Sequence, residues 1–207
     1  MNYDIIVIGG GHAGVEAASA GASMGCSVAL ITMDKYAIGR MSCNPAIGGT
    51  AKGHLVREID ALGGLMGKLA DKTGIQFRML NKSKGPAVWS PRCQSDRKLY
   101  SEEAYNVISS TANLEIVEET IKDIIVENGE VKGVEAYSGN LIFGKAIILS
   151  SGTFLNALMH TGLNSTSGGR YGEKPSMGIT ESLVKLGFET GRLKTGTPPR
   201  LAKDTID

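Results

Sequence analysis

The sequence has few cysteines, almost no net charge and no long apolar run. Its three cysteines are odd in number and lack Cys-x-x-Cys spacing, so neither a disulfide framework nor a zinc site is indicated, and no metal site is expected. A net charge of +1 excludes a globally basic nucleic-acid binder but leaves room for a local basic patch. No stretch of about 18 apolar residues exists to span a bilayer, and the apolar run at Tyr3–Ile8 is too short for a secretory signal. The chain is therefore expected to act in the cytoplasm, away from membranes.

Glycine, in contrast, is abundant. The 28 glycines among 207 residues are about twice the average usage of roughly 7%, so many positions require tight turns or close approach of the backbone. The 42% hydrophobic and 21% charged residues are ordinary for a globular core. This length allows one large domain, or one domain and part of another.

The N-terminal segment has the order strand, glycine-rich turn, helix, strand. Tyr3–Ile8, "YDIIVI", is a continuous apolar run typical of a strand buried on both faces of a parallel sheet. It leads into "GGGHAG", and the alanine-rich segment from Val15 to Met24 is expected to be a helix that ends at Gly25. A second apolar strand, Ser27 to Ile31, follows. This context favours a dinucleotide-binding unit.

Three glycines in the turn fit the spacing Gly-x-Gly-x-x-Gly. Gly9 allows the tight turn, Gly11 lets the backbone approach a diphosphate, and Gly14 allows the helix to pack closely on the strand. The diphosphate would lie at the helix N-terminus, where unpaired N–H groups favour negative charge. The alternative is a purely structural turn. The His12 side chain is expected to point away from the diphosphate. The positions expected to form the cofactor site are Gly9, Gly10, Gly11, His12, Ala13 and Gly14.

The residue that would hold the ribose departs from the usual pattern. The fingerprint expects an acidic residue at the end of the second strand. Here that strand ends at Thr32, and Asp34 follows two residues later. Either Thr32 bonds the ribose or Asp34 reaches back to it; as an alternative, Asp34 is a solvated loop residue.

The segment from Asn113 to Thr153 is rich in expected strands. Asn128-Gly129 is a strong hairpin signal, and Ser138-Gly139-Asn140 is a second turn, so a small antiparallel meander is expected. The run "KAIILSSGTF" then predicts a buried strand followed by Ser150-Ser151-Gly152-Thr153.

This order of elements resembles that of two-dinucleotide-binding flavoproteins. In these proteins a glycine fingerprint, a meander and a strand ending in a Ser/Thr-Gly motif follow one another. The resemblance favours FAD over NAD and implies an α/β, Rossmann-like FAD-binding domain with an antiparallel β-meander. It also implies cofactor contacts at Gly152 and at the backbone of Ile121, next to the adenine.

Five longer segments resemble the glucose-inhibited division protein A family (GidA, also MnmG) of flavin-dependent tRNA uridine 5-carboxymethylaminomethyl modification enzymes. They are "IGGGHAGVEAA", "MSCNPAIGGTAKGHLVREIDALGGLMGKLAD", "GIQFRMLNKSKGPAV", "SGGRYGEKPS" and "GRLKTGTPPR". Members of this family are about three times longer, so the resemblance implies an N-terminal fragment. Residues 1–160 would be the FAD-binding domain with a basic insertion around residues 40–110, and residues 161–207 the truncated start of a second domain.

The resemblance also implies an activity. NADH would reduce the bound FAD, and the reduced flavin would take part in transferring a one-carbon unit from methylenetetrahydrofolate to C5 of the wobble uridine of certain tRNAs. Ammonium or glycine would supply the amine. A GTPase partner, MnmE, would bind the absent C-terminal part, and the family forms homodimers. Ser176 would contact the flavin, and the fragment alone is expected to be inactive.

Cys43, in "CNPAIGG", is the candidate catalytic residue. Flavin disulfide reductases carry a cysteine pair here, but no second cysteine follows until Cys93, so a dithiol relay is not expected. A thiolate that adds to C6 of uridine makes C5 nucleophilic. A helix N-terminus or the nearby Lys52, His54 and Arg57 would lower the pKa of the thiol. The alternative is that Cys43 is a small buried hydrophobe.

A basic segment is the candidate tRNA-binding region. It contains six cations against Asp96 alone, with Trp89 among them and with Gly85-Pro86 and Pro91 marking a loop. Such a loop suits phosphate contact and stacking on an unpaired base; the alternative is a solvated loop with Trp89 tucked into the core. The six cations are Arg78, Lys82, Lys84, Arg92, Arg97 and Lys98. Further cations that would contact tRNA, FAD phosphates or the nicotinamide cofactor are Arg170, Arg192, Lys194 and Arg200.

Three rival functions remain open at this point. A folate-dependent tRNA uridine methyltransferase shares the glycine fingerprint but is not expected to carry "CNPAIGG". A general flavin oxidoreductase would act on a small molecule. A non-catalytic nucleotide-binding module would act through protein interaction.

Overall fold

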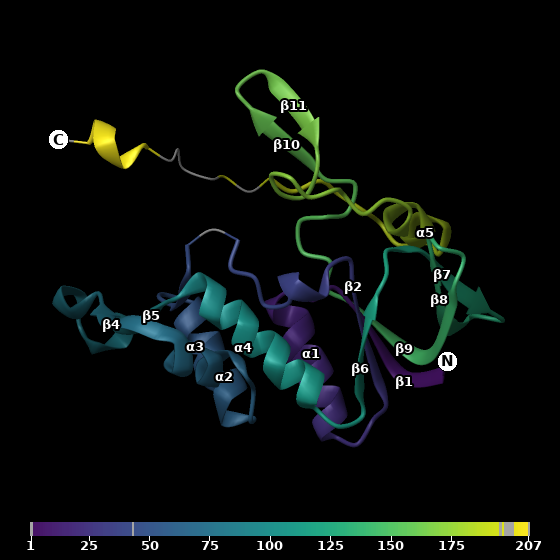
Figure 1. The fold of residues 1–207 in the computed structure, drawn as a ribbon, viewed down its shortest axis with the longest axis horizontal. Helices are drawn as coiled ribbons and strands as arrows, with labels where there is room; N and C mark the ends of the chain where they lie inside the picture. Colours follow the sequence, from purple (N-terminus) through teal and green to yellow (C-terminus); the bar gives the residue numbers. More distant parts are fainter. Residues whose placement is uncertain (1, 43, 195, 197–200, 207) are drawn as a thin grey trace.

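A six-stranded sheet forms the centre of the molecule. The computed structural model describes residues 2–42, 44–194, 196 and 201–206 (Figure 1). The strand order is β6-β2-β1-β9-β8-β7. β1 (Asn2–Ile8), β2 (Val28–Thr32), β6 (Leu114–Glu118) and β9 (Leu141–Leu149) run parallel, and β8 (Glu130–Ala136) and β7 (Ile121–Glu127) extend the sheet antiparallel. The mixed α/β architecture expected from the sequence is confirmed.

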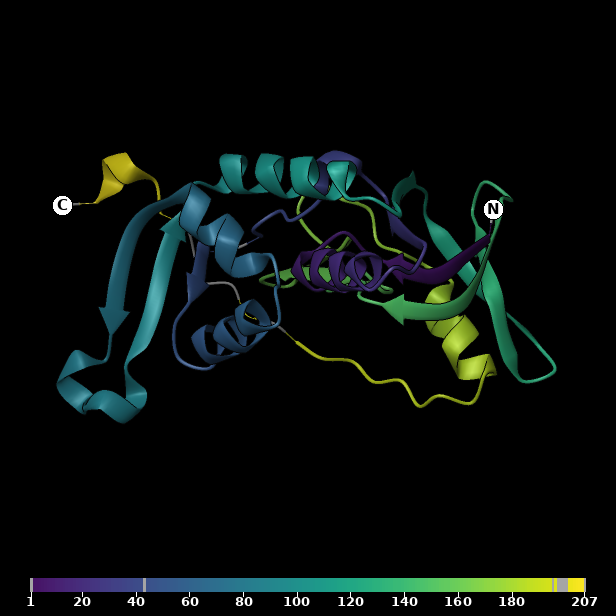
Figure 2. The same cartoon turned by 90° about the horizontal axis from the view of Figure 1, so that it is seen from below.

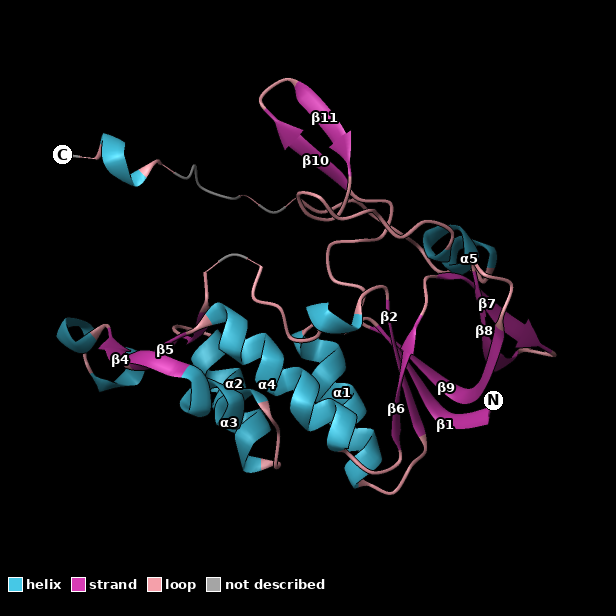
Figure 3. Cartoon of the chain, viewed as in Figure 1, coloured by secondary structure: helices cyan, strands magenta, loops and turns pink. Residues whose placement is uncertain are grey.

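Apolar side chains of the central strands alternate between two cores. Val7 and Leu30 face a core shared with α1 (His12–Ser23), α4 (Arg97–Ser110) and α3 (Met66–Thr73). Their neighbours Ile6 and Ile31 face the second core, which the meander and α5 (Ile179–Lys185) complete. Figure 3 shows α1 and α4 together on one side of the sheet. Both faces of the strands are thereby buried, as the unbroken apolar runs predict.

α1 begins three residues earlier than the sequence predicts. It runs from His12 to Ser23, so that Gly14 lies inside its first turn. Gly25, with φ +86°, follows the helix end in the left-handed conformation, as expected for a terminating glycine.

The expected antiparallel meander is present. Asn128 and Gly129 have φ of +53° and +80° between β7 and β8, as a two-residue hairpin turn requires. The second turn leads directly into β9, which pairs with β8 on one side and with β1 on the other. The third meander strand and the strand expected from "KAIILSSGTF" are thus one element, and several of its residues are exposed rather than buried.

A separate three-stranded antiparallel sheet lies within the expected basic insertion. It has the order β3-β5-β4, made by β3 (Ala46–Gly48), β5 (Ser90–Ser95) and β4 (Gly74–Leu80), and it packs with α3 and α2 (Lys52–Ala61). The short helices η2 (Lys82–Lys84) and η3 (Pro86–Val88) form the tip of the β4–β5 arm. Figures 1 and 2 show this arm at the end of the molecule opposite to α5.

The remaining elements follow β2 or lie towards the C-terminus. η1 (Lys35–Ala37) follows β2, and η4 (Lys203–Thr205) lies near the end of the chain. β10 (Leu158–Thr161) and β11 (Asn164–Ser167) form an exposed hairpin that the sequence pattern did not predict. None of the helices in the described part of the chain is both long and apolar enough to cross a bilayer.

Candidate functional site

The glycine-rich turn after β1 has the geometry that its spacing predicts. Gly9 has φ +111°, and a Cβ there would lie 2.4 Å from the Ser150 carbonyl oxygen. A Cβ at Gly14 would lie 1.8 Å from the Gly9 carbonyl oxygen. A Cβ at Gly11, in contrast, would meet nothing within 4 Å. Two of the glycines are therefore needed for packing, and the third leaves space for a ligand.

The N-terminus of α1 opens at this space. Gly11 is the capping residue and offers no side chain to bond the first N–H groups, and no acidic residue lies in the first turn. Unpaired N–H groups and the helix dipole make such an end attractive to anions. The backbone is thus suited to a diphosphate, and the donor set fits an adenine dinucleotide such as FAD.

A cleft of about 120 Å³ surrounds this helix end. β1, β2 and β9 all point their carboxyl ends into it; the chain adds β2 and β6 on one side of β1 and later adds β9 on the other side. Ligands of open α/β sheets bind at such switch points. The residues predicted from the sequence that line this cleft are Gly9, Gly10, Gly11, Thr32, Asp34, Gly152 and Ser176. His12, Ala13 and Ile121 are predicted residues that do not line it.

Thr32 and Asp34 lie together at the end of β2. The Thr32 hydroxyl donates to the Asp34 carbonyl oxygen over 3.1 Å. The Asp34 carboxylate accepts from the Tyr36 amide over 2.8 Å and approaches an Arg40 nitrogen at 3.4 Å. The carboxylate is therefore held at the cleft by two donors while its side chain stays 47% exposed, and both ribose alternatives are compatible with the geometry.

His12 packs against a neighbouring helix. Its ring meets Tyr100 edge to face, with 5.5 Å between the ring centroids. Burial lowers the pKa of His12 to about 4, and the charges of Lys52 and Arg170 act in the same direction. The imidazole is neutral at pH 7, in accord with a packing role.

Ser176 and Ile121 occupy different surroundings. Ser176 is buried at the cleft, and its amide donates to the Phe154 carbonyl oxygen over 2.8 Å. Ile121 is the first residue of β7, with its side chain in the second core. The cleft residue nearest to it in sequence is Glu119, whose carboxylate accepts from Ser138 and Asn140. The proposed adenine contact of Ile121 stays a prediction.

Several cleft residues were not predicted from the sequence. The Ser150 hydroxyl donates to the carbonyl oxygens of Ile8 and Gly9 and so ties the end of β9 to the turn after β1. Its position directly after a parallel strand is a signal that could have identified it. The other unpredicted residues that line the cleft are Ile8, Ile31, Met33, Ala37, Glu119, Ser151, Phe154 and Glu173; Arg170, which also lines it, was expected only as one of four loop cations that would contact tRNA, FAD phosphates or the nicotinamide cofactor.

The six candidate tRNA-binding cations are spread over four elements, β4, η2, β5 and α4, rather than one loop. Arg78 and Arg92 face each other across the β4–β5 ladder, and the arm tip carries Lys82 and Lys84. Arg97 and Lys98 begin α4. The expected loop around Pro91 is wrong, because Pro91 lies in β5.

Trp89 lies at the surface of the arm. It is 44% exposed, and its indole nitrogen donates to the Lys82 carbonyl oxygen over 3.3 Å. The alternative that placed it in the core is therefore wrong. The arm combines exposed cations with an accessible aromatic ring.

Cys43 lies outside the described residues. Nearby in the sequence, α2 begins at Lys52, whose ammonium group donates to the Ala46 carbonyl oxygen over 3.3 Å. His54 and Arg57 are at least partly exposed on the same helix. The helix and the cations anticipated near Cys43 in the sequence are thus present, and the role of its thiol stays a prediction.

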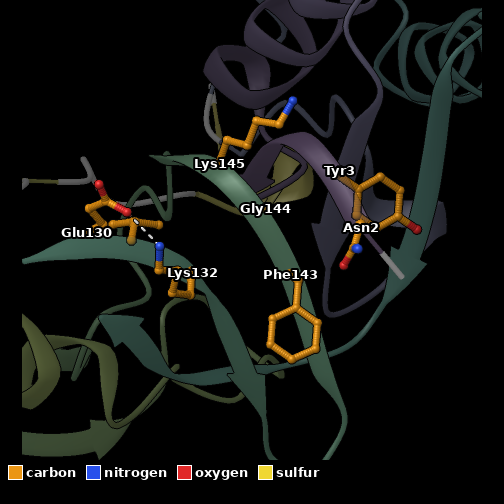
Figure 4. Close-up of a pocket in the computed structure, with 8 residues that line it drawn as sticks. Asn2, Tyr3, Glu130, Lys132, Phe143, Gly144 and Lys145 are labelled. Carbon is orange, nitrogen blue, oxygen red and sulfur yellow. Dashed lines mark hydrogen bonds and ion pairs between the residues drawn. The ribbon is translucent and has the colours of Figure 1, made fainter. Parts of the chain in front are cut away.

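A second, wider groove lies at the opposite end of the central strands from the cleft. It measures about 630 Å³ and is lined by the first residues of β1 together with parts of β8 and β9. Figure 4 shows its paired Glu130 and Lys132 and the ring of Phe143. It is larger than the cleft, but it lies at the amino ends of β1 and β8. Its lining includes neither a helix N-terminus nor a glycine-rich turn, so the cleft is the better candidate for a cofactor site.

The amino-acid sequence of this chain is similar to those of known tRNA-modifying enzymes. The chain is 57% identical over 206 residues to the tRNA uridine 5-carboxymethylaminomethyl modification enzyme MnmG of Thermodesulfovibrio yellowstonii, covering 100% of this chain and 33% of that protein. It is 55% identical over 205 residues to the MnmG of Flavobacterium psychrophilum, covering 99% of this chain and 33% of that protein. The chain thus spans about a third of the length of these curated relatives.

Solved structures show the same fold. Aquifex aeolicus GidA matches with a TM-score of 0.95 and 51% identity, covering 100% of this chain and 34% of that one. The GidA-related protein from Thermus thermophilus matches with a TM-score of 0.66 at 20% identity, covering 90% and 69%, which shows a likeness of fold alone. The model of the family described as glucose inhibited division protein A matches residues 4–207. The chain therefore belongs to the glucose inhibited division protein A family.

Proposed function

We propose that this chain is the FAD-binding part of an enzyme that forms 5-carboxymethylaminomethyl-type groups at the wobble uridine of tRNA. Family membership supports the reaction, and one structural observation supports the cofactor. That observation is the open N-terminus of α1 at the switch point of the sheet, where Gly11 leaves space for a diphosphate.

The residues of the cleft have distinct proposed roles. The Gly11 backbone and the first N–H groups of α1 hold the diphosphate, and Thr32 or Asp34 holds the ribose. Ser176 contacts the flavin, and Ile121 contacts the adenine through its backbone. When bound, FAD would supply two-electron redox chemistry, with NADH as the reductant and methylenetetrahydrofolate as the one-carbon donor.

Cys43 is the proposed nucleophile. Its thiolate sulfur bonds to C6 of the uridine, and the electron pair of the C5–C6 double bond moves towards C5 and the neighbouring carbonyl, which makes C5 nucleophilic. After the one-carbon unit has been attached at C5, loss of the C5 proton and of the thiolate restores the double bond. The GTPase partner MnmE, bound through a C-terminal part outside this chain, and a second copy of the enzyme complete the proposed assembly.

The full-length protein provides the test of this function. We expect the purified protein to be yellow and its flavin absorbance to be bleached by NADH without oxygen. A strain that lacks the gene should regain wobble-uridine modification with the wild-type copy and with Cys26→Ala, but not with Cys43→Ala. FAD content must be equal in both variants. Normal modification by Cys43→Ala would exclude the thiol mechanism. Bleaching without tRNA modification would favour a small-molecule oxidoreductase.

The β4–β5 arm is the proposed tRNA contact. The double variant Lys82→Glu/Lys84→Glu should weaken tRNA binding and flatten its salt dependence, by about one unit of log–log slope for each phosphate that is no longer bound. Lys185→Glu, on α5, is the control and should change neither quantity. Both are measured by titrating tRNA at several salt concentrations. An unchanged slope in the double variant would remove the arm tip from the tRNA site.

A further inference from the structure

Arg170 lies at the edge of the cleft on a tight turn. The Glu173 amide donates to the Arg170 carbonyl oxygen over 3.0 Å, and Gly172 between them has φ +79°. Gly169 lies under the Phe154 ring, where a Cβ would come within 2.3 Å of a ring carbon. The Arg170 guanidinium in turn lies over that ring, 5.2 Å from its centroid. Backbone and ring together fix where this cation points.

The guanidinium has an unused donor. Its Nε is buried and has no hydrogen-bond partner among the described residues. No carboxylate in the described part of the chain forms an ion pair with it either, although Glu173 lies only three residues away. A buried N–H without a partner is unfavourable, and in native proteins such groups usually have an acceptor. The acceptor at Arg170 is therefore not supplied by the described chain.

The ion pair between Arg40 and Glu173 explains why Arg170 has no carboxylate partner among the described residues. One Arg40 nitrogen donates to the Glu173 carboxylate over 2.8 Å, and the other lies 3.4 Å from the Asp34 carboxylate. Arg40 thus neutralises the nearby acidic group of Glu173 and ties the turn to the end of β2. The Arg170 charge acts towards the start of α1 instead, where it contributes to the lowered pKa of His12.

We infer that Arg170 is a ligand of the cofactor diphosphate, opposite the N-terminus of α1, and that the Arg40–Glu173 ion pair keeps its guanidinium available. The inference rests on the proposed FAD site and adds a side chain to its diphosphate part, which otherwise consists of backbone N–H groups. A guanidinium suits this task, because its fork of N–H groups matches the oxygens of a phosphate.

ADP and adenosine separate this role from general packing. Calorimetric titration of the full-length protein, stripped of flavin, should show that Arg170→Met weakens ADP binding about tenfold to hundredfold. Adenosine, which lacks the diphosphate, should bind with nearly the wild-type affinity. Arg170→Lys keeps the charge and should lose less. Arg57→Met, on α2 away from the cleft lining, is the matched control and should bind ADP normally.

A double-mutant cycle tests the part played by Arg40. Arg40→Met frees the Glu173 carboxylate to pair with Arg170, so ADP binding should weaken severalfold. Adding Glu173→Gln removes the competing charge and should recover most of that loss, which is the coupling expected of interacting residues. No recovery in the double variant would overturn the proposed role of the ion pair.

The outcomes distinguish the inference from the proposed function. If the wild-type protein binds FAD and ADP but Arg170→Met and Arg170→Lys bind ADP equally well, only the role of Arg170 is overturned. Equal weakening of ADP and adenosine by Arg170→Met would also overturn it, because the effect would then be structural. If the wild-type protein binds neither FAD nor ADP, the cofactor site itself is wrong.

Discussion

Gly11 and Gly14 belong to one motif but differ in what surrounds them. A Cβ at Gly14 would overlap the Gly9 carbonyl oxygen, whereas a Cβ at Gly11 would point into open space. Gly11 has φ −73°, an ordinary value for any residue. Gly14 is therefore constrained by packing, whereas no described residue constrains Gly11, which leaves the proposed diphosphate contact as the reason for a glycine there.

Alanine substitutions should separate these two constraints. Gly14→Ala should lower the free energy of unfolding by about 1–3 kcal/mol, as overpacking does. Gly11→Ala should cost less than about 1 kcal/mol, the range of a lost helix cap, yet it should weaken ADP binding. Urea unfolding of the ligand-free protein and ADP titration measure the two effects. A Gly11→Ala variant that binds ADP normally would contradict the close approach of the diphosphate.

His12 should make stability depend on pH. Its pKa is about 4 in the folded protein and about 6.5 when unfolded, so the unfolded chain binds more protons between these values. The contribution of neutral His12 to the free energy of unfolding is fully present above pH 6.5. It is lost as pH falls towards 4, which lowers that free energy by up to roughly 3 kcal/mol. His12→Gln should flatten the fall in unfolding free energy over this range, as measured by urea unfolding at several pH values. His54→Gln, at an exposed position of α2, should leave it unchanged.

Local spacing predicted one half of the cleft and missed the other. Thr32 and Asp34 could be identified because Thr32 ends the recognisable strand β2 and Asp34 follows it by two residues. Arg40 and Glu173 could not, since 133 residues separate them and no local pattern links them. Arg170 was predictable only as one of several loop cations. Contacts between distant segments depend on tertiary packing, which periodicity does not report.

At the scale of elements, Glu16 joins α1 to α3. Its carboxylate accepts from the Leu65 amide at 3.0 Å and from the Met66 amide at 2.5 Å, at the start of α3. A carboxylate at a helix N-terminus bonds otherwise unpaired N–H groups and complements the helix dipole. One residue of α1 thereby ties the insertion to the helix that begins at the cleft.

Removal of the Glu16 carboxylate should destabilise the insertion without disrupting the structure of the cleft. Glu16→Ala should lower the free energy of unfolding by about 1–3 kcal/mol, because two amides lose their acceptor. Amide hydrogen exchange should quicken mainly in α2 and α3. Glu58→Ala, exposed on α2, is the control and should have little effect. Uniformly faster exchange across β1 and β2 would argue against a local linkage.

Elements with strong local signals were the ones predicted correctly. Asn128-Gly129 specified a hairpin, and the structure has one. The β4–β5 arm was expected to be a loop because Pro91 and Gly85-Pro86 are turn residues. Pro91 nevertheless fits in β5, opposite Met79 in a sheet of only three strands. Proline is tolerated near the start of a strand, so composition alone misled there.

At the scale of the whole molecule, the cleft is small for its proposed ligand. It measures about 120 Å³, whereas pockets for ligands of this kind are typically about 300–1,000 Å³. The chain also spans only about a third of the length of its curated relatives. The residues that surround the N-terminus of α1 suit the ADP half of FAD. Further residues are needed to enclose the flavin half.

The first 207 residues expressed alone should therefore distinguish the two halves of the cofactor. We expect them to bind ADP within a fewfold of the full-length affinity, because the α1 N-terminus and Arg170 are both present. FAD should bind at least about tenfold more weakly than it does to the full-length protein, a difference of about 1.4 kcal/mol or more. Equilibrium dialysis measures both, after a cooperative thermal transition has shown that the polypeptide is folded. Equal FAD affinity of the short and the full-length protein would mean that these residues already enclose the flavin. Loss of ADP affinity as well would mean that the diphosphate site itself depends on the rest of the protein.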